Sequence, residues 1–233
     1  MSSQNLKTKS HEDAAQVCDQ ACPLCESQGA SLFHQDNNKR TNRPYYRCVS
    51  CHLVFVPAAF YLSEAEEKAE YDFHENKAGD SGYQRFLMRF WEPFKSILPE
   101  GASILEFGCG PGPVLASMMK DDGYDVALFD HFYRPDQSVI QPLYYDGISS
   151  TEVIEHVHQP KKTIKLLLES LKSNGVLGLM TKMVESPEKF KNWHYKNDLT
   201  HVCFYSELTF KWVAREYNLQ VSFYGADVIL LQK

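Results

Sequence analysis

The most regular hydrophobic pattern in the chain is an alternation of short apolar runs and amphipathic segments from about residue 100 to the C-terminus. Strands that alternate with helices in this way favour an α/β fold with a mostly parallel sheet. The last two strands are separated only by Gly225-Ala-Asp, which predicts a closing antiparallel hairpin. We expect strands at 104–109, 125–130, 145–150, 175–183, 220–225 and 227–232, and helices at about 112–121, 161–173 and 206–217.

Two further helices are predicted before this alternation begins. Ser63 and Glu66 form a capping-box pattern that starts a helix through about Tyr71. The second helix is a long aromatic stripe at three-to-four spacing, with Pro93 predicting a kink. We interpret it as a core helix that docks the N-terminal part of the chain onto the sheet. Its apolar positions are Tyr83, Phe86, Leu87, Phe90, Trp91, Phe94, Ile97 and Leu98.

Four cysteines near the N-terminus are spaced as two pairs. Cys22 and Cys25 form one C-x2-C knuckle, Cys48 and Cys51 form the other, and 22 residues lie between them. This spacing suits a tetrahedral zinc site on two short hairpins, and its role would be structural because protein fills all four positions. Neighbouring Cys18 or His52 is an alternative ligand. The expected organisation is a flexible tail over 1–20, a zinc ribbon over 21–57, a helical linker or cap over 58–99 and an α/β domain over 100–233.

Composition and charge narrow the class of protein. A chain of 233 residues with 43% hydrophobic content can bury one substantial core and a small satellite module. The net charge is −6, and residues 57–233 carry 18 Lys and Arg against 25 Asp and Glu, which does not favour a phosphate backbone as partner. The N-terminus lacks an apolar run of signal-peptide length, and no stretch would span a bilayer. We expect a cytoplasmic protein without a membrane partner, whose cysteines bind metal rather than form disulfides.

A glycine-rich turn follows the first predicted strand of the α/β part. It reads Glu106-Phe-Gly-Cys-Gly-Pro-Gly112 and precedes a helix. Glycine lets the backbone adopt positive φ and approach a ligand closely, and the helix offers free N–H groups. The next apolar run ends at Asp130, whose carboxylate can accept both hydroxyls of a ribose. The dinucleotide-binding pattern fails because position 113 is Pro, so the turn predicts a different nucleotide-cofactor loop.

An acidic residue before G-x-G-x-G resembles the pattern of class I S-adenosylmethionine (SAM) methyltransferases. The likeness continues in Tyr145–Val157 and Leu171–Leu179 and covers about residues 100–233. It implies a Rossmann-like sheet of the seven-stranded methyltransferase type and SAM as cofactor. The cofactor-binding residues that it implies are Glu106, Gly108, Gly110, Gly112, Asp130, His131 and Glu152.

One region departs from that family. Only fourteen residues lie between Asp130 and Tyr145, too few for the usual helix and full third strand. We therefore expect a shortened third-strand region, with an adenine pocket built from His131, Phe132 and 139–143. Helices before the first strand commonly cover the cofactor in the family, which makes 71–76 and 80–83 secondary candidates for contacts.

Candidate chemistry lies after the strands predicted at 145–150 and 175–183, which resemble the family's fourth and fifth strands. Glu152-Val-Ile-Glu155-His156 resembles an arrangement that holds a divalent cation in some quinone-pathway O-methyltransferases, although E-x-x-E-H is widespread without metal. We prefer His156 as a site-lining residue. The long connection 185–205 predicts a lid whose titratable groups act as general base. The candidate catalytic residues are His194, Tyr195, His201 and His156.

The leading hypothesis is SAM-dependent methyl transfer to carbon or oxygen of a small or carrier-bound metabolite. The second is RNA methylation, in which 39–47, with four cations, two tyrosines and no acid, presents the substrate. We favour the alternative interpretation of 39–47 as a solvated hairpin tip. The third is a non-catalytic cofactor-binding scaffold, which requires that the short 131–144 region leave no closed pocket.

Overall fold

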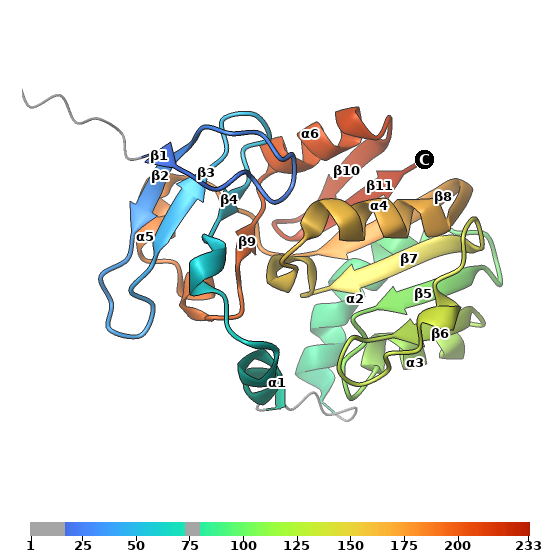
Figure 1. Cartoon of the computed structure of the whole chain (residues 1–233). Helices are drawn as coiled ribbons and strands as arrows, with labels where there is room; N and C mark the ends of the chain where they lie inside the picture. The colour runs from blue at the N-terminus through green and yellow to red at the C-terminus, as the bar shows by residue number, and fades with distance from the viewer. Residues whose placement is uncertain (1–16, 73–79) are drawn as a thin grey trace, which may run out of the picture.

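The computed structural model describes residues 17–72 and 80–233, which form two β-sheets and the helices around them (Figure 1). The larger sheet has six strands in the order β10-β11-β8-β7-β5-β6. Neighbouring strands among β5, β6, β7 and β8 run parallel, whereas β11 pairs antiparallel with both β8 and β10. The predicted α/β class and closing hairpin are therefore confirmed. The bounds are β5 Ser103–Phe107, β6 Asp125–Phe129, β7 Tyr145–Thr151, β8 Leu171–Met180, β10 Gln220–Tyr224 and β11 Val228–Gln232.

Helices cover both faces of this sheet and divide the core into two clusters. One face packs against α2 (Ser81–Lys95) and α3 (Val114–Asp121), and the other against α4 (Pro160–Ser170) and α6 (Glu207–Glu216). Alternation along β11 follows from the two-residue period of a strand, because Val228 and Leu230 belong to the first cluster and Ile229 and Leu231 to the second. Between β6 and β7 the only regular element is the short 3-10 helix η2 (Gln137–Val139), as the shortened third-strand region predicts.

A second sheet has five strands in the order β1-β2-β3-β4-β9. Its first four strands come from the N-terminus, whereas β9 comes from the chain after β8 and pairs with β4 (Figure 1). We call residues 17–57 the cysteine module. The bounds are β1 Val17–Cys18, β2 Ala30–Gln35, β3 Pro44–Arg47, β4 Val54–Phe55 and β9 Cys203–Phe204.

Two predictions about the N-terminal part are corrected by this sheet. The tail predicted over 1–20 is too long, because Val17 and Cys18 pair with β2; residues 1–16 lie outside the described residues. The aromatic helix α2 packs on the six-stranded sheet and α3, while the cysteine module joins the rest through β9. Strand pairing, which aromatic periodicity does not encode, therefore carries the docking that we assigned to α2.

The shorter elements connect these layers. The capping box of α1 (Glu64–Asp72) forms as predicted, with the Ser63 amide donating to the Glu66 carboxylate at 2.9 Å. None of the helices within 17–72 and 80–233 combines the length and apolarity needed to cross a bilayer. The remaining elements are the 3-10 helices η1 (Ala58–Phe60), η3 (Ile154–His156) and η4 (His194–Asn197) and the short helix α5 (Pro187–Lys191).

Close packing between α2 and the sheet depends on glycines in the two central strands. A Cβ built at Gly178 would lie 2.8 Å from ring atoms of both Phe90 and Phe94, and one at Gly147 would lie 2.8 Å from Phe94. Both distances are shorter than a carbon–carbon contact allows. The aromatic rings therefore lie directly on the backbone of β7 and β8, where a side chain would hold α2 away.

We expect Gly178→Ala to lower the free energy of unfolding by about 1–3 kcal/mol, because the added methyl group overpacks the contact with Phe90 and Phe94. Chemical denaturation of the wild type, G178A, F90L and the double variant measures this effect. Leucine at position 90 is smaller than phenylalanine and relieves the clash with the new methyl group. The loss of stability caused by G178A should therefore be smaller in the F90L background. Equal losses in both backgrounds would contradict the packing argument.

Candidate functional site

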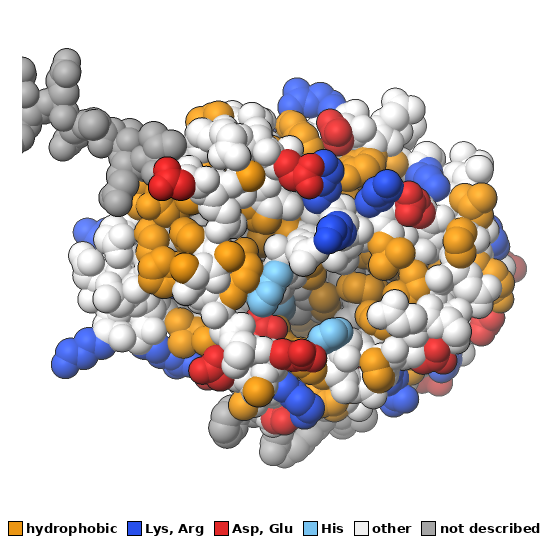
Figure 2. Space-filling model, in the orientation of Figure 1, with side chains coloured by type: hydrophobic (Ala, Val, Ile, Leu, Met, Phe, Trp, Pro, Cys, Tyr) orange, Lys and Arg blue, Asp and Glu red, His pale blue; other side chains and the backbone are white. Residues whose placement is uncertain are grey.

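A cavity of about 900 Å³ opens at the carboxyl ends of β5, β6 and β7. In open α/β sheets this edge is where ligands bind. Figure 2 shows the hollow in the middle of one face, with acidic and histidine side chains around it. Its walls come from the glycine loop 106–112, from 129–140, from the chain after β7 and from the loop 195–201.

The glycine loop has the backbone that its sequence predicts. Gly108 and Gly110 have φ angles of 81° and 62°, in the left-handed region that favours glycine. A Cβ at Gly108 would lie 2.3 Å from the Val153 side chain, whereas one at Gly110 would meet nothing within 4 Å. Gly108 is therefore needed for both conformation and space, and Gly110 leaves the cavity open beside the loop.

Asp130 fixes the shape of this loop from the end of β6. Its carboxylate accepts backbone hydrogen bonds from Gly110 at 2.8 Å, Phe132 at 2.9 Å and Tyr133 at 3.0 Å. The residue is 9% exposed and lines the cavity. The prediction that Asp130 accepts ribose hydroxyls stays a prediction; in this structure its oxygens hold the two strand-end turns together.

Glu106 presents a carboxylate that is incompletely paired. It is 5% exposed, lines the cavity, and one of its oxygens has no hydrogen-bond partner among the described residues. Burial raises the pKa of Glu106 to about 8, against a weaker opposing effect of the Ala116 backbone. A cationic group in the cavity would both pair that oxygen and favour the ionised form. The ammonium of the methionine part of SAM has this charge, so the site fits the cofactor that the resemblance implies.

The short segment after β6 supplies the wall that the missing third strand would otherwise provide. His131, Phe132, Gln137 and Ile140 all line the cavity. His131 is largely exposed, with Nε2 3.3 Å from the Glu64 carboxylate. Of the secondary candidates, Tyr71 and Tyr83 also line the cavity, while Phe73–Asn76 lie outside the described residues.

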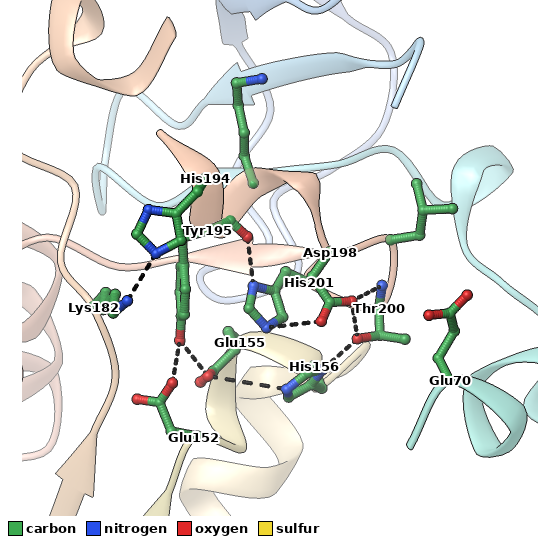
Figure 3. A network of polar contacts seen from close by, with 12 residues as sticks. Glu70, Glu152, Glu155, His156, Lys182, His194, Tyr195, Asp198, Thr200 and His201 are labelled. Atoms are coloured by element: carbon green, nitrogen blue, oxygen red, sulfur yellow. Dashed lines mark hydrogen bonds and ion pairs between the residues drawn. The ribbon is translucent and has the colours of Figure 1, made fainter. Parts of the chain in front are cut away.

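Glu152, Glu155 and Tyr195 form a polar cluster at the cavity wall (Figure 3). The Tyr195 hydroxyl contacts a Glu155 oxygen, lies 3.4 Å from Glu152 and lies 3.2 Å from the Thr181 hydroxyl. Burial raises the pKa of Glu155 to about 8, and the neighbouring Glu152 carboxyl adds to this effect. Burial likewise raises the pKa of Glu152, which lines the cavity, to about 7.

Tyr195 is disfavoured as a general base. Burial and the two adjacent carboxyl groups raise its pKa well above 10, so the phenol stays protonated near neutral pH. Its side chain lies beneath the cavity and supports Glu152 and Glu155. His194, on the same short 3-10 helix, is exposed, and its Nε2 lies 3.0 Å from the Lys182 ammonium rather than among the residues that line the cavity.

The other two candidate bases do line the cavity and are held by a hydrogen-bonded chain. Asp198 accepts from the Thr200 amide at 2.9 Å and from the Thr200 hydroxyl at 2.6 Å. Because that hydroxyl donates its single proton to Asp198, it accepts from His156 Nδ1 at 2.8 Å. His156 Nε2 is then the ring atom that accepts a proton.

His201 lies beside His156, with ring centroids 4.5 Å apart. Its Nδ1 donates to the Tyr195 carbonyl at 2.8 Å, and its Nε2 lies 3.8 Å from the Asp198 carboxylate. Burial opposes the charge of Asp198, but His201 and the Thr200 bonds outweigh it and lower the Asp198 pKa. An ionised Asp198 therefore favours a proton on either imidazole. Ligating atoms of Glu155, His156 and His201 also lie within 4.8 Å of one another, whereas Glu152 is outside this group.

The four knuckle cysteines meet at one point of the cysteine module. The Sγ atoms of Cys22 and Cys51 are 3.5 Å apart, those of Cys25 and Cys48 are 3.4 Å apart, and all four lie within 4.8 Å of one another. Tetrahedral Zn–S bonds of about 2.3 Å require sulfur separations of about 3.8 Å, so the donor set suits zinc. The two alternative ligands, Cys18 and His52, lie outside this group.

Each knuckle turns in the same way. Glu26 and His52, directly after the second cysteine of each pair, have φ angles of 60° and 61°. Their amides donate to the carbonyls of Cys22 at 2.8 Å and Cys48 at 3.1 Å. This matched backbone brings both thiols of a pair to the same side.

Arg43 is the residue whose place the sequence analysis missed. The interpretation of 39–47 as a solvated tip is wrong for Arg43, which is 2% exposed and donates to four backbone carbonyls of the loop 195–201. Carbonyl acceptors can belong to any residue type, so no sequence signal could have identified these partners. Lys39 and Arg40 at the turn are exposed as expected.

Comparisons with known proteins identify one family and several similar folds. The family described as "Methyltransferase domain" matches residues 74–222. No curated protein matches the chain. The fold is similar to that of a SAM-dependent methyltransferase of Archaeoglobus fulgidus (14% identity, 66% of this chain and 100% of that chain, TM-score 0.49).

Two further solved structures are similar. One is the 1,6-didemethyltoxoflavin-N1-methyltransferase of Burkholderia thailandensis (12% identity, 80% of this chain and 98% of that chain, TM-score 0.47). The other is a SAM-dependent methyltransferase of Thermotoga maritima (17% identity, 65% of this chain and 94% of that chain, TM-score 0.43). Because the family match spans more than half of the chain and includes the glycine loop and the strands around the cavity, the chain belongs to the methyltransferase-domain family, and the expected SAM-dependent methyltransferase is confirmed.

Proposed function

We propose that the protein transfers the methyl group of SAM to a carbon or oxygen atom of a small or carrier-bound metabolite, with His156 and His201 as its acid–base groups. The observation that carries this proposal is the arrangement within one cavity of a glycine loop, the incompletely paired Glu106 and two histidines. Bound SAM supplies an electrophilic methyl group, so the protein has to orient an acceptor and, where needed, remove its proton.

The cofactor would be held by residues at the ends of β5 and β6. Glu106 would pair with its ammonium group, and the open backbone at Gly110 would allow close approach of the methionine part. Asp130 would contact the ribose, and His131 and Phe132 the adenine side. Glu152 lies where the chain leaves β7 and would complete the wall.

The acceptor would be deprotonated from the side of the loop 195–201. Thr200 keeps a proton on His156 Nδ1, which leaves Nε2 as the basic atom. The ionised Asp198 would stabilise a protonated His156 through Thr200. It would also stabilise a protonated His201 directly, because its carboxylate lies 3.8 Å from His201 Nε2. Glu155 and Tyr195 carry protons near neutral pH, so they act beneath these groups as supports.

Charge around the cavity favours a metabolite over RNA. Its lining includes the acids Glu67, Asp130 and Asp198 against one lysine, Lys162. Glu106 and Glu152 also line it, although burial raises their pKa values and lowers their negative charge near neutral pH. Arg43 is unavailable to phosphate because its guanidinium is buried. The cavity itself argues against a scaffold without a closed pocket.

We further propose that the four-cysteine group binds one structural Zn²⁺. Cys22, Cys25, Cys48 and Cys51 would supply all four ligands, which leaves no position for substrate. Metal would join the two knuckles and would contribute to folding of the cysteine module.

The role of Glu106 is tested by proton release on SAM binding. Glu106 with a pKa near 8 is mostly protonated at pH 7, and pairing with a cation ionises it. Titration calorimetry at pH 7 in buffers of different ionisation enthalpy should therefore detect close to one proton released to the buffer. Glu106→Gln should abolish that release and weaken binding about tenfold or more, whereas the exposed control Glu100→Gln should change neither. Equal proton release by wild type and E106Q would refute the assignment.

The acid–base assignment is tested with labelled SAM and a cell extract. We expect His156→Ala to lower methyl transfer about 10²-fold to 10⁴-fold, the range of general acid–base catalysis, and His201→Ala to lower it too. SAM affinity should stay within about twofold, because these rings face the acceptor. His194→Ala provides the matched control, because this histidine directly before the loop is exposed and does not line the cavity. Loss of transfer in H194A but not in H156A would reverse the assignment.

Metal analysis of the purified protein should find one zinc per chain. Cys48→Ser should lose that zinc and unfold at lower temperature, because three thiolates hold the ion less tightly and the module depends on it. Cys18→Ser removes a buried thiol outside the group and should keep the metal. A metal-free protein that unfolds at the same temperature with and without chelator would contradict the proposal.

A further inference from the structure

The acid–base groups of the cavity depend on a short segment, most of which lies outside helices and strands. Loop 195–201 starts within η4 and ends just before β9, and it carries Asp198, Thr200 and His201. Its amides and side chains bond to one another, but four of its carbonyls converge on a single side chain from the cysteine module. That side chain is Arg43, more than 150 residues earlier.

The guanidinium of Arg43 matches this set of carbonyls. Nη1 donates to Leu199 at 2.8 Å, and Nη2 lies 2.9 Å from Asp198, 2.9 Å from His201 and 3.3 Å from Lys196. Nε donates to the Tyr45 hydroxyl at 3.0 Å. A planar fork of five N–H donors can serve acceptors on several sides, whereas a lysine ammonium has three donors on one atom.

Two neighbours of Arg43 hold the same loop. The Tyr45 hydroxyl donates to the Lys196 carbonyl at 3.0 Å. The Lys196 ammonium forms a buried ion pair with Asp36, the residue directly after β2. Asp36 is in turn held by the Thr41 hydroxyl at 2.8 Å and the Asn38 amide at 2.9 Å. Three side chains of the cysteine module thus converge on the loop.

The hydrogen bonds from Arg43 to the four carbonyls, which we call the clamp, bear directly on the two imidazoles. Two of the carbonyls that Arg43 binds belong to Asp198 and His201 themselves, so the clamp fixes the backbone from which both side chains project. Thr200 lies between them in the sequence, and its hydroxyl accepts a hydrogen bond from His156. The position of the loop therefore also orients the His156 imidazole. Without Arg43, the carbonyls of Asp198, Leu199 and His201 would lose this donor and would turn toward water, at the cost of the loop's conformation. The Lys196 carbonyl would keep only the Tyr45 hydroxyl.

We infer that Arg43 is a positioning residue for methyl transfer, and that the cysteine module is required to hold loop 195–201 of the active site in place. The inference rests on the proposed acid–base role of His156 and His201. Arg43 touches neither cavity nor substrate, and it acts through the backbone of loop 195–201. Its burial also removes it from any surface that could bind a nucleic acid.

The test compares Arg43→Ala and Arg43→Lys with Arg40→Ala, which removes an exposed arginine of the same turn whose partner is Glu70. Methyl transfer with labelled SAM and a cell extract measures turnover, and calorimetry measures SAM affinity. We expect both Arg43 variants to lose turnover, R43A by about 100-fold, the scale of a displaced catalytic group, while SAM affinity stays within about twofold. R40A should match wild type in both.

Two readouts separate positioning from a general loss of structure. Amides in 198–203 should exchange hydrogen faster in R43A, while those of β5 and β7 keep their protection. Guanidinium at millimolar concentration should restore part of the R43A turnover by filling the vacated space, and should leave wild type unchanged. If R43A does not fold, R43K answers the same question, because it keeps the charge and loses the fork.

The outcomes are distinguishable. Normal turnover in a folded R43A or R43K, with wild type active, overturns the inference and leaves the proposed function intact. Failure of wild type to methylate any component of the extract counts against the proposed function; hydrogen exchange then still decides whether Arg43 holds the loop, and unchanged exchange in R43A overturns the clamp itself.

Discussion

Buried backbone polar groups between the two sheets are the constraint on which the site depends. Residues 195–204 run between the cysteine module and the edge of the main core, where water does not reach most of their amides and carbonyls. Each of those groups needs a partner, and the partners come from both sides. Val56 donates to the Val202 carbonyl at 2.9 Å, and the Val202 amide donates to the Glu155 carbonyl at 2.9 Å. The segment is thereby fixed to the cysteine module and to the turn after β7 at once.

Electrostatic environment then divides the carboxyl groups of the site into two kinds. Glu106 and Glu155 are buried and Glu152 is half-buried, all with few donors, and burial raises their pKa values to between about 7 and about 8. Asp198 is half-buried as well, but His201 and Thr200 keep its pKa low. The three glutamates can therefore bind a cation or stay neutral, while Asp198 stabilises positive charge on an imidazole. Residue type alone would give all four the same role; their neighbours distinguish them.

Local patterns were sufficient to predict most elements and the residues of the loop and knuckles. Strand alternation, the glycine turn and the paired cysteines each reflect a local need for a particular residue type. Gly108, for example, adopts a left-handed φ that favours glycine. The burial of Tyr195 and the exposure of His194 were not predictable in this way, because both are adjacent residues of η4 and only tertiary packing decides which of them is buried. Arg43 was harder still, since a cluster of cations in sequence reads as a solvated turn. Its partners are carbonyls, which leave no mark in the sequence.

Contacts between the cysteine module and the rest of the chain show that the region that matches the family is smaller than the part that folds together. It begins at residue 74, beyond the cysteine module, yet β9 lies inside it and pairs with β4 outside it. Tyr45 packs edge-to-face on Phe190 and Phe204 with centroids 5.0 and 5.6 Å apart, so the core of the matched region continues into the module. Removing the module would expose these rings and take away the donors that Arg43 and Tyr45 give to the carbonyls of loop 195–201. The region that matches the family is therefore completed here, next to its acid–base groups, by residues that precede it in the chain.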